Sequence, residues 1–354
     1  MEFTKHLICG LLLVSFPALG KIELPRFAAK FAVENIRFMT QDGRFSYTQK
    51  RSGALTLSTS FKSTDVIESA PGTNYYVTAT SARKKVLVEI ERDWHRNMDL
   101  TKLHDIQVGT FNGTQFNSIG RGRAARLHLD DEWASWFDPK EKVIHVQRLK
   151  VADDHHVIRL GKKHNPFFIP DVVMVDANTI LYTDINDKGF AAVLAWNIRD
   201  RKMTVVQKAT ASGTRMELCR QSNYVALGDF SYEDANRGSS ISVMAWTDRP
   251  NLAGFTSVYR VSDNDIGNML CAPGKIWFVK TMSEDRKLNT RITEAVSLDL
   301  ATTKITAASE LERVTQLIDM DGRILLPYRD EIYVLEGSAG SNTEVLKTPT
   351  RGKP

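Results

Sequence analysis

Cysteine is scarce in this sequence, with three residues among 354, which excludes a small domain held together by a disulfide framework. Long apolar runs are also scarce, and none after residue 20 is apolar enough to cross a membrane. Neither sign of charge dominates, because 47 Lys and Arg face 42 Asp and Glu. The sequence thus lacks the dense basic stripe of a nucleic-acid-binding surface, and we expect no nucleic-acid partner. With 42% hydrophobic and 25% charged residues, the composition is that of a folded globular protein.

Short catalytic motifs are also missing. The sequence contains no G-x-S-x-G, no H-E-x-x-H, no P-loop and no G-x-G-x-x-G. The run GRGRAAR (120–126) has glycines but does not follow the dinucleotide-binding pattern. Asp130-Asp131-Glu132 falls in a predicted turn, where Asp is favoured for backbone geometry alone. The sequence therefore assigns no catalytic residue, and we expect no cofactor.

Residues 1–20, MEFTKHLICGLLLVSFPALG, have the three parts of an export signal. Lys5 lies in a short basic region, an apolar stretch runs from Leu7 to Leu19, and small residues precede a cut before Lys21. A transmembrane anchor is the alternative, but the stretch is shorter than the roughly 20 apolar residues that a span needs. We therefore predict a periplasmic or secreted protein, exported by a bacterial signal.

A pattern of an apolar strand, a tight turn and a second strand rich in aromatic and β-branched residues recurs along the chain. The turn centres run from Gly43 to Gly322, so six intervals cover 279 residues at a mean of about 47. The copies span residues 35–49, 65–80, 125–137, 171–184, 215–230, 268–281 and 316–328.

A third strand with period-2 patterning follows each copy, and a fourth follows most of them, whereas helical periodicity is weak throughout. Four short strands per unit at this spacing predict an all-β fold, a seven-bladed β-propeller of four-stranded antiparallel blades. We assign residues 21–34 to a lead-in segment, 35–348 to the propeller and 349–354 to a disordered tail. Ring closure would use residues 343–348 or a strand from Lys21–Phe27.

Three of the turns carry a family resemblance. TQDGR before FSYT, CAPGK before IWFV and DMDGR before ILLP resemble the SPDGK-type turn of TolB-like and WD40-like propellers. In those families this turn joins the innermost strand of a blade to the second strand. The Gly-His and Trp-Asp pairs of strict WD40 repeats are absent. The resemblance implies the fold and does not select an activity.

Aligning the turns gives columns of equivalent residues. The column three residues before each turn centre is mostly small or polar, and we expect it to face the central channel or its rim; it contains Thr40, Ser69, His128, Cys219, Cys271 and Asp319. The preceding column is nearly all apolar and should pack between blades, because strand side chains alternate faces. An aromatic column, Tyr47, Tyr76, Tyr182 and Phe278, should also pack there.

Cys219 and Cys271 occupy the same column in successive repeats, in a compartment that permits disulfides. We predict a bridge between neighbouring blades, with two buried thiols as the alternative. The mixed Cys, His and Asp column raises a metal site, as does His155-His156 after Asp153-Asp154. Neither matches a local metal-binding spacing, so we assign no metal ligands.

Basic residues gather in the segments that we place between the second and third strands and between blades. The set comprises Lys50, Arg51, Arg83, Lys84, Lys85, Arg121, Arg123, Lys162 and Lys163. One interpretation is a face that attracts anionic partners, and the other is an ordinary solvated surface.

We therefore predict an exported, monomeric, non-catalytic propeller that binds an anionic macromolecule, such as an acidic protein or a cell-envelope polymer, or scaffolds an envelope complex. The alternative is a propeller-based hydrolase or lyase, glycosidase-like, with its site at the central channel mouth. A small-molecule or metal sensor that uses the channel is a third possibility.

Overall fold

Every regular element in the described part of the chain is a β-strand. The computed structural model describes residues 20–22, 36–39, 45–48, 54–59, 63–69, 73–78, 85–92, 101–110, 116–129, 131–151, 153–165, 168–212, 214–221, 223–231, 238–246, 254–261, 266–285, 290–312, 317–320, 323–328 and 331–335. The predicted export signal, apart from its last residue, and the predicted tail lie outside these residues, as do residues 343–348.

Five of the six sheets have four strands, and all strand pairs are antiparallel. One contains β2 (Ile36–Met39), β3 (Phe45–Thr48), β4 (Ala54–Thr59) and β5 (Ser63–Ser69). The next contains β13 (Val172–Met174), β14 (Thr179–Ile185), β15 (Phe190–Asn197) and β16 (Lys202–Ser212). The third contains β17 (Thr214–Gln221), β18 (Tyr224–Ser231), β19 (Ser239–Ala245) and β20 (Thr256–Val261).

The fourth contains β21 (Ile266–Ala272), β22 (Lys275–Asp285), β23 (Thr290–Asp299) and β24 (Ile305–Glu312). The fifth joins both ends of the fold. It contains β25 (Ile318–Met320), β26 (Arg323–Tyr328) and β27 (Glu331–Leu335), and β1 (Gly20–Ile22) pairs with β27. A strand near the N-terminus therefore completes the last sheet, which is the second of the two closures expected from the sequence.

The sixth sheet has seven strands because one strand serves two units. It contains β6 (Asn74–Thr78), β7 (Val86–Glu91), β8 (His104–Gly109), β9 (Asn117–His128), β10 (Trp133–Asp138), β11 (Val143–Arg148) and β12 (His155–Arg159). The first half of β9 pairs with β8 and the second half with β10. The chain thus passes from the outer strand of one quartet, β6–β9, to the inner strand of the next, β9–β12, without an intervening loop.

The glycines of the GRGR run make this passage possible. A Cβ atom on Gly120 would lie 2.6 Å from the ring of Trp136, and one on Gly122 would lie 2.6 Å from the carbonyl oxygen of Phe137. Both distances are well inside van der Waals contact, so a larger residue would displace the strand or the indole. The glycines of the GRGR run therefore allow β9 to lie close against β10.

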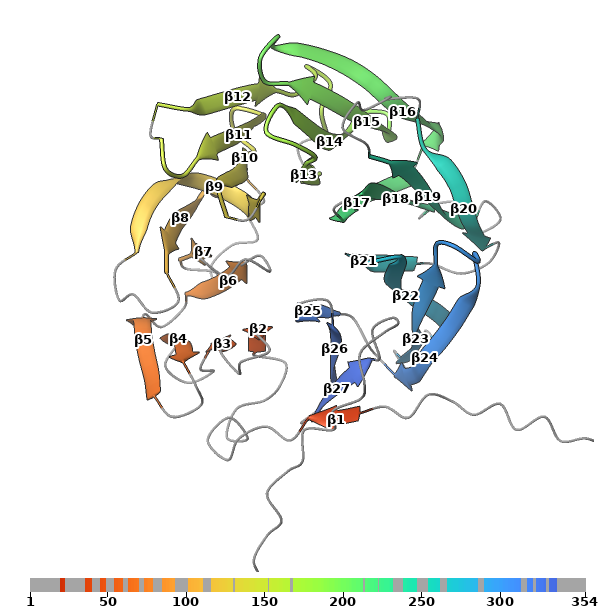
Figure 1. Ribbon diagram of the computed structural model, residues 1–354. Helices are drawn as coiled ribbons and strands as arrows, with labels where there is room; N and C mark the ends of the chain where they lie inside the picture. The colour runs from red at the N-terminus through yellow and green to blue at the C-terminus, as the bar shows by residue number, and fades with distance from the viewer. Residues whose placement is uncertain are drawn as a thin grey trace, which may run out of the picture.

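The sheets stand around a central opening, and the strands nearest the centre of the four-stranded sheets are β2, β13, β17, β21 and β25 (Figure 1). Apolar side chains fill the space between adjacent sheets. Tyr182, Trp133 and Phe137 belong to one such cluster, between β9–β12 and β13–β16. Phe278 belongs to another, between β17–β20 and β21–β24. These sheets bury their faces against one another, which is how the units of a repeat protein form a shared core.

The aromatic column has a mixed outcome. Tyr182 and Phe278 are buried between sheets as expected, whereas Tyr76 is 43% exposed. The second repeat explains this difference. Residues 63–69 form β5, the outer strand of the first sheet, and β6 is the inner strand of the next. Pro71-Gly72 thus falls between two sheets in the strand order, where we expected a turn inside one blade. Turn residues are favoured in both kinds of connection, so the sequence did not distinguish them. Ser69 consequently lies on an outer strand, and Tyr76 on an inner one.

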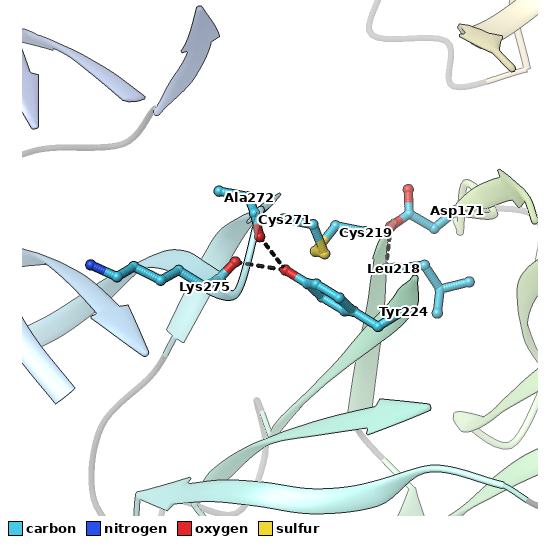
Figure 2. Close-up of a disulfide and its surroundings, with 7 residues drawn as sticks. All are labelled: Asp171, Leu218, Cys219, Tyr224, Cys271, Ala272 and Lys275. Atoms are coloured by element: carbon cyan, nitrogen blue, oxygen red, sulfur yellow. Dashed lines mark hydrogen bonds between the residues drawn. A yellow bond between two sulfur atoms is a disulfide. The ribbon is translucent and has the colours of Figure 1, made fainter. Parts of the chain in front are cut away.

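The disulfide prediction is confirmed. Cys219 on β17 is bonded to Cys271 on β21, with Cα atoms 5.5 Å apart, and the bond ties two neighbouring sheets together at their inner strands (Figure 2). Tyr224 adds a second tie nearby, because its hydroxyl proton is shared between the carbonyl oxygens of Ala272, at 2.7 Å, and Lys275, at 2.6 Å.

We expect replacement of both cysteines, Cys219→Ser with Cys271→Ser, to lower the free energy of unfolding by roughly 2–4 kcal/mol, because the unfolded chain loses a cross-link across 52 residues. Urea unfolding of the parent and the double variant measures this difference. Tyr224→Phe is a companion variant that keeps the cross-link and removes only the hydroxyl. Two reactive thiols in the denatured, unreduced parent protein would contradict the prediction.

Candidate functional site

The ring has two ends with different chain connections. In an antiparallel four-stranded sheet, the turns between strands one and two and between strands three and four lie at one end, here called the turn face. The turns between strands two and three and the links between sheets lie at the other, here called the connection face. Lys142, in the β10–β11 turn, donates from Nζ to the carbonyl oxygen of His164, in the β12–β13 link, at 3.3 Å. This contact joins two segments of the connection face.

Four of the predicted partner-binding residues lie on the connection face. Lys162 and Lys163 are exposed in the link between β12 and β13. Arg121, whose side chain is 65% exposed, and the half-buried Arg123 lie where β9 passes between quartets. Lys50 and Arg51 lie outside the described residues. Whether these residues bind a partner stays a prediction.

Lys85 lies at the opposite end of the ring from the one expected. Lys85 directly precedes β7, so its segment joins strands one and two of the quartet β6–β9. Its backbone N–H donates to Asp131 Oδ2, in the turn between β9 and β10, at 2.9 Å. Both segments belong to the turn face. The misassignment follows from the second repeat, whose turn we placed one link too early; Arg83 and Lys84 themselves lie outside the described residues.

The column expected to face the channel divides into several environments. Cys219 and Cys271 form the disulfide, which leaves neither thiol available to a metal. Asp319 lies on the inner strand β25, and Ser69 on the outer strand β5. Thr40 lies outside the described residues. His128 is only 7% exposed, so it is enclosed between sheets instead of facing a solvated channel.

His128 lies on the face of β9 that packs toward β13–β16. Its register partner is Trp133, and its Nε2 is 2.7 Å from Ser135 Oγ. Burial, with the charges of Arg126 and Arg220 nearby, lowers the pKa of His128 to about 3. The ring is therefore neutral in the folded protein at any ordinary pH, and a charge there would be costly.

Charged side chains that the column analysis missed gather on the inner strands. Arg126 on β9 and Arg215 on β17 are 41% and 52% exposed. An exposed side chain on an inner strand reaches solvent through the channel or its ends. Arg126 pairs with Asp171, just before β13, and Arg215 pairs with Glu217 at 2.6 Å. Charged residues inside a predicted inner strand are the sequence signal that could have indicated these ion pairs, as in R-A-A-R (123–126) and T-R-M-E (214–217).

Asp171 connects three sheets. One carboxylate oxygen accepts from Arg126, and the other accepts from the backbone N–H of Leu218 on β17 at 2.7 Å (Figure 2). Its own N–H donates to Thr183 Oγ1 at 2.8 Å.

Glu217 lies close to Asp171. Burial raises the pKa of Glu217, and the charge of Arg215 partly offsets this by lowering it. The Asp171 carboxylate, which contacts two neighbouring sheets, therefore lies close to a second carboxyl group whose pKa is raised.

A second polar group surrounds Tyr76. Its hydroxyl donates to Glu91 Oε2 at 3.0 Å, and its ring lies parallel to that of His104, with centroids 6.1 Å apart. His104 is 1% exposed, and its Nδ1 is 2.5 Å from Glu89 Oε1. Glu89 Oε2 also accepts from the N–H of Ala125 on β9, at 3.0 Å. Burial, with Glu91 beside it, raises the pKa of Tyr76 to about 12, so the phenol keeps its proton.

The candidate metal site at His155-His156 is not formed, because neighbouring residues of a strand face opposite ways and the two rings have different partners. His155 Nε2 is 3.1 Å from His145 Nδ1, and both rings lie parallel to Trp136. His156 contacts Asp154 at 2.8 Å instead. Within the described ranges, no group of three or more His, Cys, Asp or Glu is placed to hold a metal ion.

The sequence matches no protein-family profile and no curated protein. Among solved structures the chain is similar to the tricorn protease, with a TM-score of 0.57 and 12% identity over 90% of this chain and 35% of that one. It is also similar to the Swd1 β-propeller domain of Myceliophteria thermophila, with a TM-score of 0.53 and 9% identity over 89% of this chain and 97% of that domain. A third is the oligogalacturonate lyase of Vibrio parahaemolyticus, with a TM-score of 0.51 and 9% identity over 80% and 77% of the two chains.

At these identities the likeness shows the fold alone. The chain has an all-β fold similar to that of β-propeller proteins, as the repeat predicted. It spans about a third of the length of the tricorn protease chain. The similar structures include a protease, a lyase and the Swd1 β-propeller domain, so the fold alone does not select a function.

We expect neutral His128 to make stability fall in acid. Its folded pKa of about 3 lies below the value of about 6.5 for an unfolded histidine, so protons bind the unfolded state first as the pH drops. This group should remove about 2 kcal/mol of unfolding free energy between pH 7 and pH 5. Denaturant unfolding of the parent and of His128→Gln at both pH values measures the difference. Equal pH dependence in both proteins would show that His128 titrates normally.

Proposed function

We propose that this chain is an exported, non-catalytic β-propeller that binds an anionic macromolecule through its connection face. The observation that carries the proposal is the pair Lys162 and Lys163, which are exposed on that face. Within the described part of the chain, neither lysine makes an ion pair, so both charges are available to a partner. Arg121, also strongly exposed, extends the basic surface toward β9, although Asp105 lies 3.3 Å from it.

The wider basic surface supports the same partner class. Lys140 and Lys188 are exposed in turns between second and third strands, and these turns also belong to the connection face. Exposed cations at one end of a rigid ring raise the local concentration of anionic partners and speed their association. Acidic proteins and acidic cell-envelope polymers both carry the complementary charge.

Export is part of the proposal and has two supports. The pattern of residues 1–20 is that of an export signal, and the Cys219–Cys271 disulfide is of a kind that persists in oxidising compartments. In the residues that the structure describes, no helix has the length and apolar character needed to cross a membrane.

The proposal also includes seven blades and a TolB-like or WD40-like arrangement of the ring. The two pairings of β9 support this count, because they divide the seven-stranded sheet into the quartets β6–β9 and β9–β12. With the five four-stranded sheets, these quartets would make seven units.

Reversing two charges tests the partner face. We expect Lys162→Glu with Lys163→Glu to slow association with polyglutamate or polygalacturonate at low salt by tenfold or more, because long-range steering depends on the sign of the face. Arg199→Glu with Arg201→Glu is the matched control, since these exposed residues lie between β15 and β16 on the turn face.

Stopped-flow or surface-based kinetics at two salt concentrations measures the association rates. The two probes separate a peptide-like partner from a polysaccharide. Unfolding free energies should change by less than about 1 kcal/mol in both variants. Equal association rates for the two charge-reversed proteins would overturn the proposal.

A hydrolase or lyase site at the channel mouth is the second candidate. The observation that favours it is Glu217, whose pKa is raised by burial, close to the carboxylate of Asp171. Two neighbouring carboxyl groups, one of them in a buried environment that raises its pKa, are the pairing used in general acid–base cleavage of glycosides.

If this candidate is correct, the parent protein should cleave an acidic polysaccharide, and Glu217→Gln should abolish cleavage while association through Lys162 and Lys163 continues. Product release from polygalacturonate, measured by reducing ends and by ultraviolet absorbance, distinguishes hydrolysis from elimination. Cleavage that survives Glu217→Gln would remove this residue from any catalytic role.

A further inference from the structure

The outer strand β16 has one edge that pairs with no strand in the described part of the chain. It is the last strand of the sheet β13–β16 and lies on the outside of the ring (Figure 1). It has 11 residues, against eight in β24, seven in β5 and six in β20, which are outer strands of other four-stranded sheets. A free edge of this length offers backbone N–H and C=O groups to an added strand.

Exposed apolar side chains gather beside this edge. Met203 is 54% exposed and Val205 45%, and they share a face with their register partners on β15, Trp196 and Leu194. Phe190 alternates onto the same face of β15 and is 42% exposed. Of the eight large apolar side chains that are exposed among the described residues, three therefore share this face. Such a row fits the alternate apolar side chains of an added strand.

Two lysines stand on either side of the apolar pair along β16. Lys202 and Lys208 are exposed, and neither makes an ion pair within the residues that the structure describes. If two copies of the chain paired their β16 strands in antiparallel fashion around Val205, Lys202 of each copy would lie opposite Lys208 of the other. Like charges directly opposite each other destabilise a strand pair, so these lysines oppose self-pairing. The same charges attract a strand that carries acidic side chains.

We propose that the free edge of β16 binds an extended segment of a partner protein, which adds as a further strand and has acidic residues on either side of apolar ones. Backbone hydrogen bonds to β16 hold the segment, its apolar side chains cover Met203 and Val205, and its carboxylates pair with Lys202 and Lys208. Met203 is held in position for this contact, because the Tyr182 hydroxyl donates to its sulfur at 3.0 Å.

This surface is separate from the connection face. It uses neither Lys162 nor Lys163, so it goes beyond the proposed function and can fail or succeed independently of it. It also selects a protein as the partner, since a polysaccharide has no amide backbone to pair with β16 and no apolar side chains to cover the row.

Fluorescence anisotropy of the full chain with a labelled peptide tests the proposal. The peptide has about eight residues, which at about 3.3 Å per residue span the exposed part of β16. It carries glutamates near both ends and valine or leucine at alternate positions between them. We expect saturable binding that is about tenfold or more tighter than that of the same peptide with serine at the apolar positions.

Methylated peptides test strand addition itself. Alternate N–H groups of a strand point to opposite sides, so only one alternate set would face β16. Methylation of that set of backbone nitrogens should abolish binding, whereas methylation of the other set should leave it intact. Binding that tolerates both methylations would overturn the proposal.

Charge reversal tests the two lysines. Lys202→Glu with Lys208→Glu should weaken binding of the peptide by about tenfold or more at about 0.15 M salt, where distant charges are largely screened. Arg159→Glu with Lys304→Glu is the matched control, because these exposed residues lie on β12 and just before β24. The control variant should bind as the parent does.

Polar substitution tests the apolar row. Val205→Thr with Met203→Gln should also weaken binding by about tenfold or more, and glutamine keeps an acceptor for the Tyr182 hydroxyl. Val157→Thr with Ile305→Thr is the matched control, since these side chains are 43% and 41% exposed on other outer strands. Circular dichroism verifies that each variant is folded.

Several outcomes would overturn the proposal. Equal affinities of the apolar and serine peptides would do so, as would equal affinities of either test variant and its control. Association of the parent with itself, or with vesicles of anionic lipid, that Val205→Thr with Met203→Gln abolishes while no peptide binds would assign the row to those partners instead. Peptide binding that is lost only in Lys162→Glu with Lys163→Glu would leave the connection face as the sole binding surface.

Discussion

The inner strands of the ring have a free edge, and much of the structure depends on how that edge is satisfied. The innermost strand of each four-stranded sheet pairs on one side only, so half of its backbone N–H groups face away from the sheet. A carboxylate of a neighbouring unit accepts one of them, because Asp171 accepts from Leu218 on β17, and Glu89 accepts in the same way from Ala125 on β9 of the seven-stranded sheet. These contacts, with the Cys219–Cys271 bond, connect the inner strands of successive sheets.

This constraint also explains why charged groups gather around these contacts. A carboxylate that accepts a backbone N–H has further lone pairs, and these attract Arg126 in one place and His104 in another. The carboxylates of Asp171 and Glu89 thereby assemble polar sites from residues of several strands. A support built from several strands suits binding and catalysis equally, and the similar structures include a lyase as well as the Swd1 propeller domain.

Much of the fold could be predicted because its signals are local. Strand alternation and turn residues lie within a few positions of each other, so the repeat, the strands and the burial of Tyr182 and Phe278 followed directly. The same locality caused the main error. Pro71-Gly72 has turn chemistry whether it joins two strands or two sheets, so Ser69, Tyr76 and Lys85 were misplaced together. His128 was misplaced for another reason: an inner strand directs alternate side chains toward its neighbouring sheets, and a polar residue there can be buried.

The sequence by itself determined the class of fold and the approximate spacing of the units, because both depend on a periodic pattern. It placed Cys219 and Cys271 at equivalent positions of successive repeats and left two buried thiols as the alternative, and the structure decided for the bond. Only the tertiary structure decided that β9 serves two quartets and that β1 completes the last sheet. It also decided the polar sites. Arg126 meets Asp171 across 45 residues of chain, and Glu89 meets His104 and Ala125 from three different strands. No spacing in the sequence encodes such meetings, because the ring brings together side chains whose separation along the chain is set by the strands and links between them.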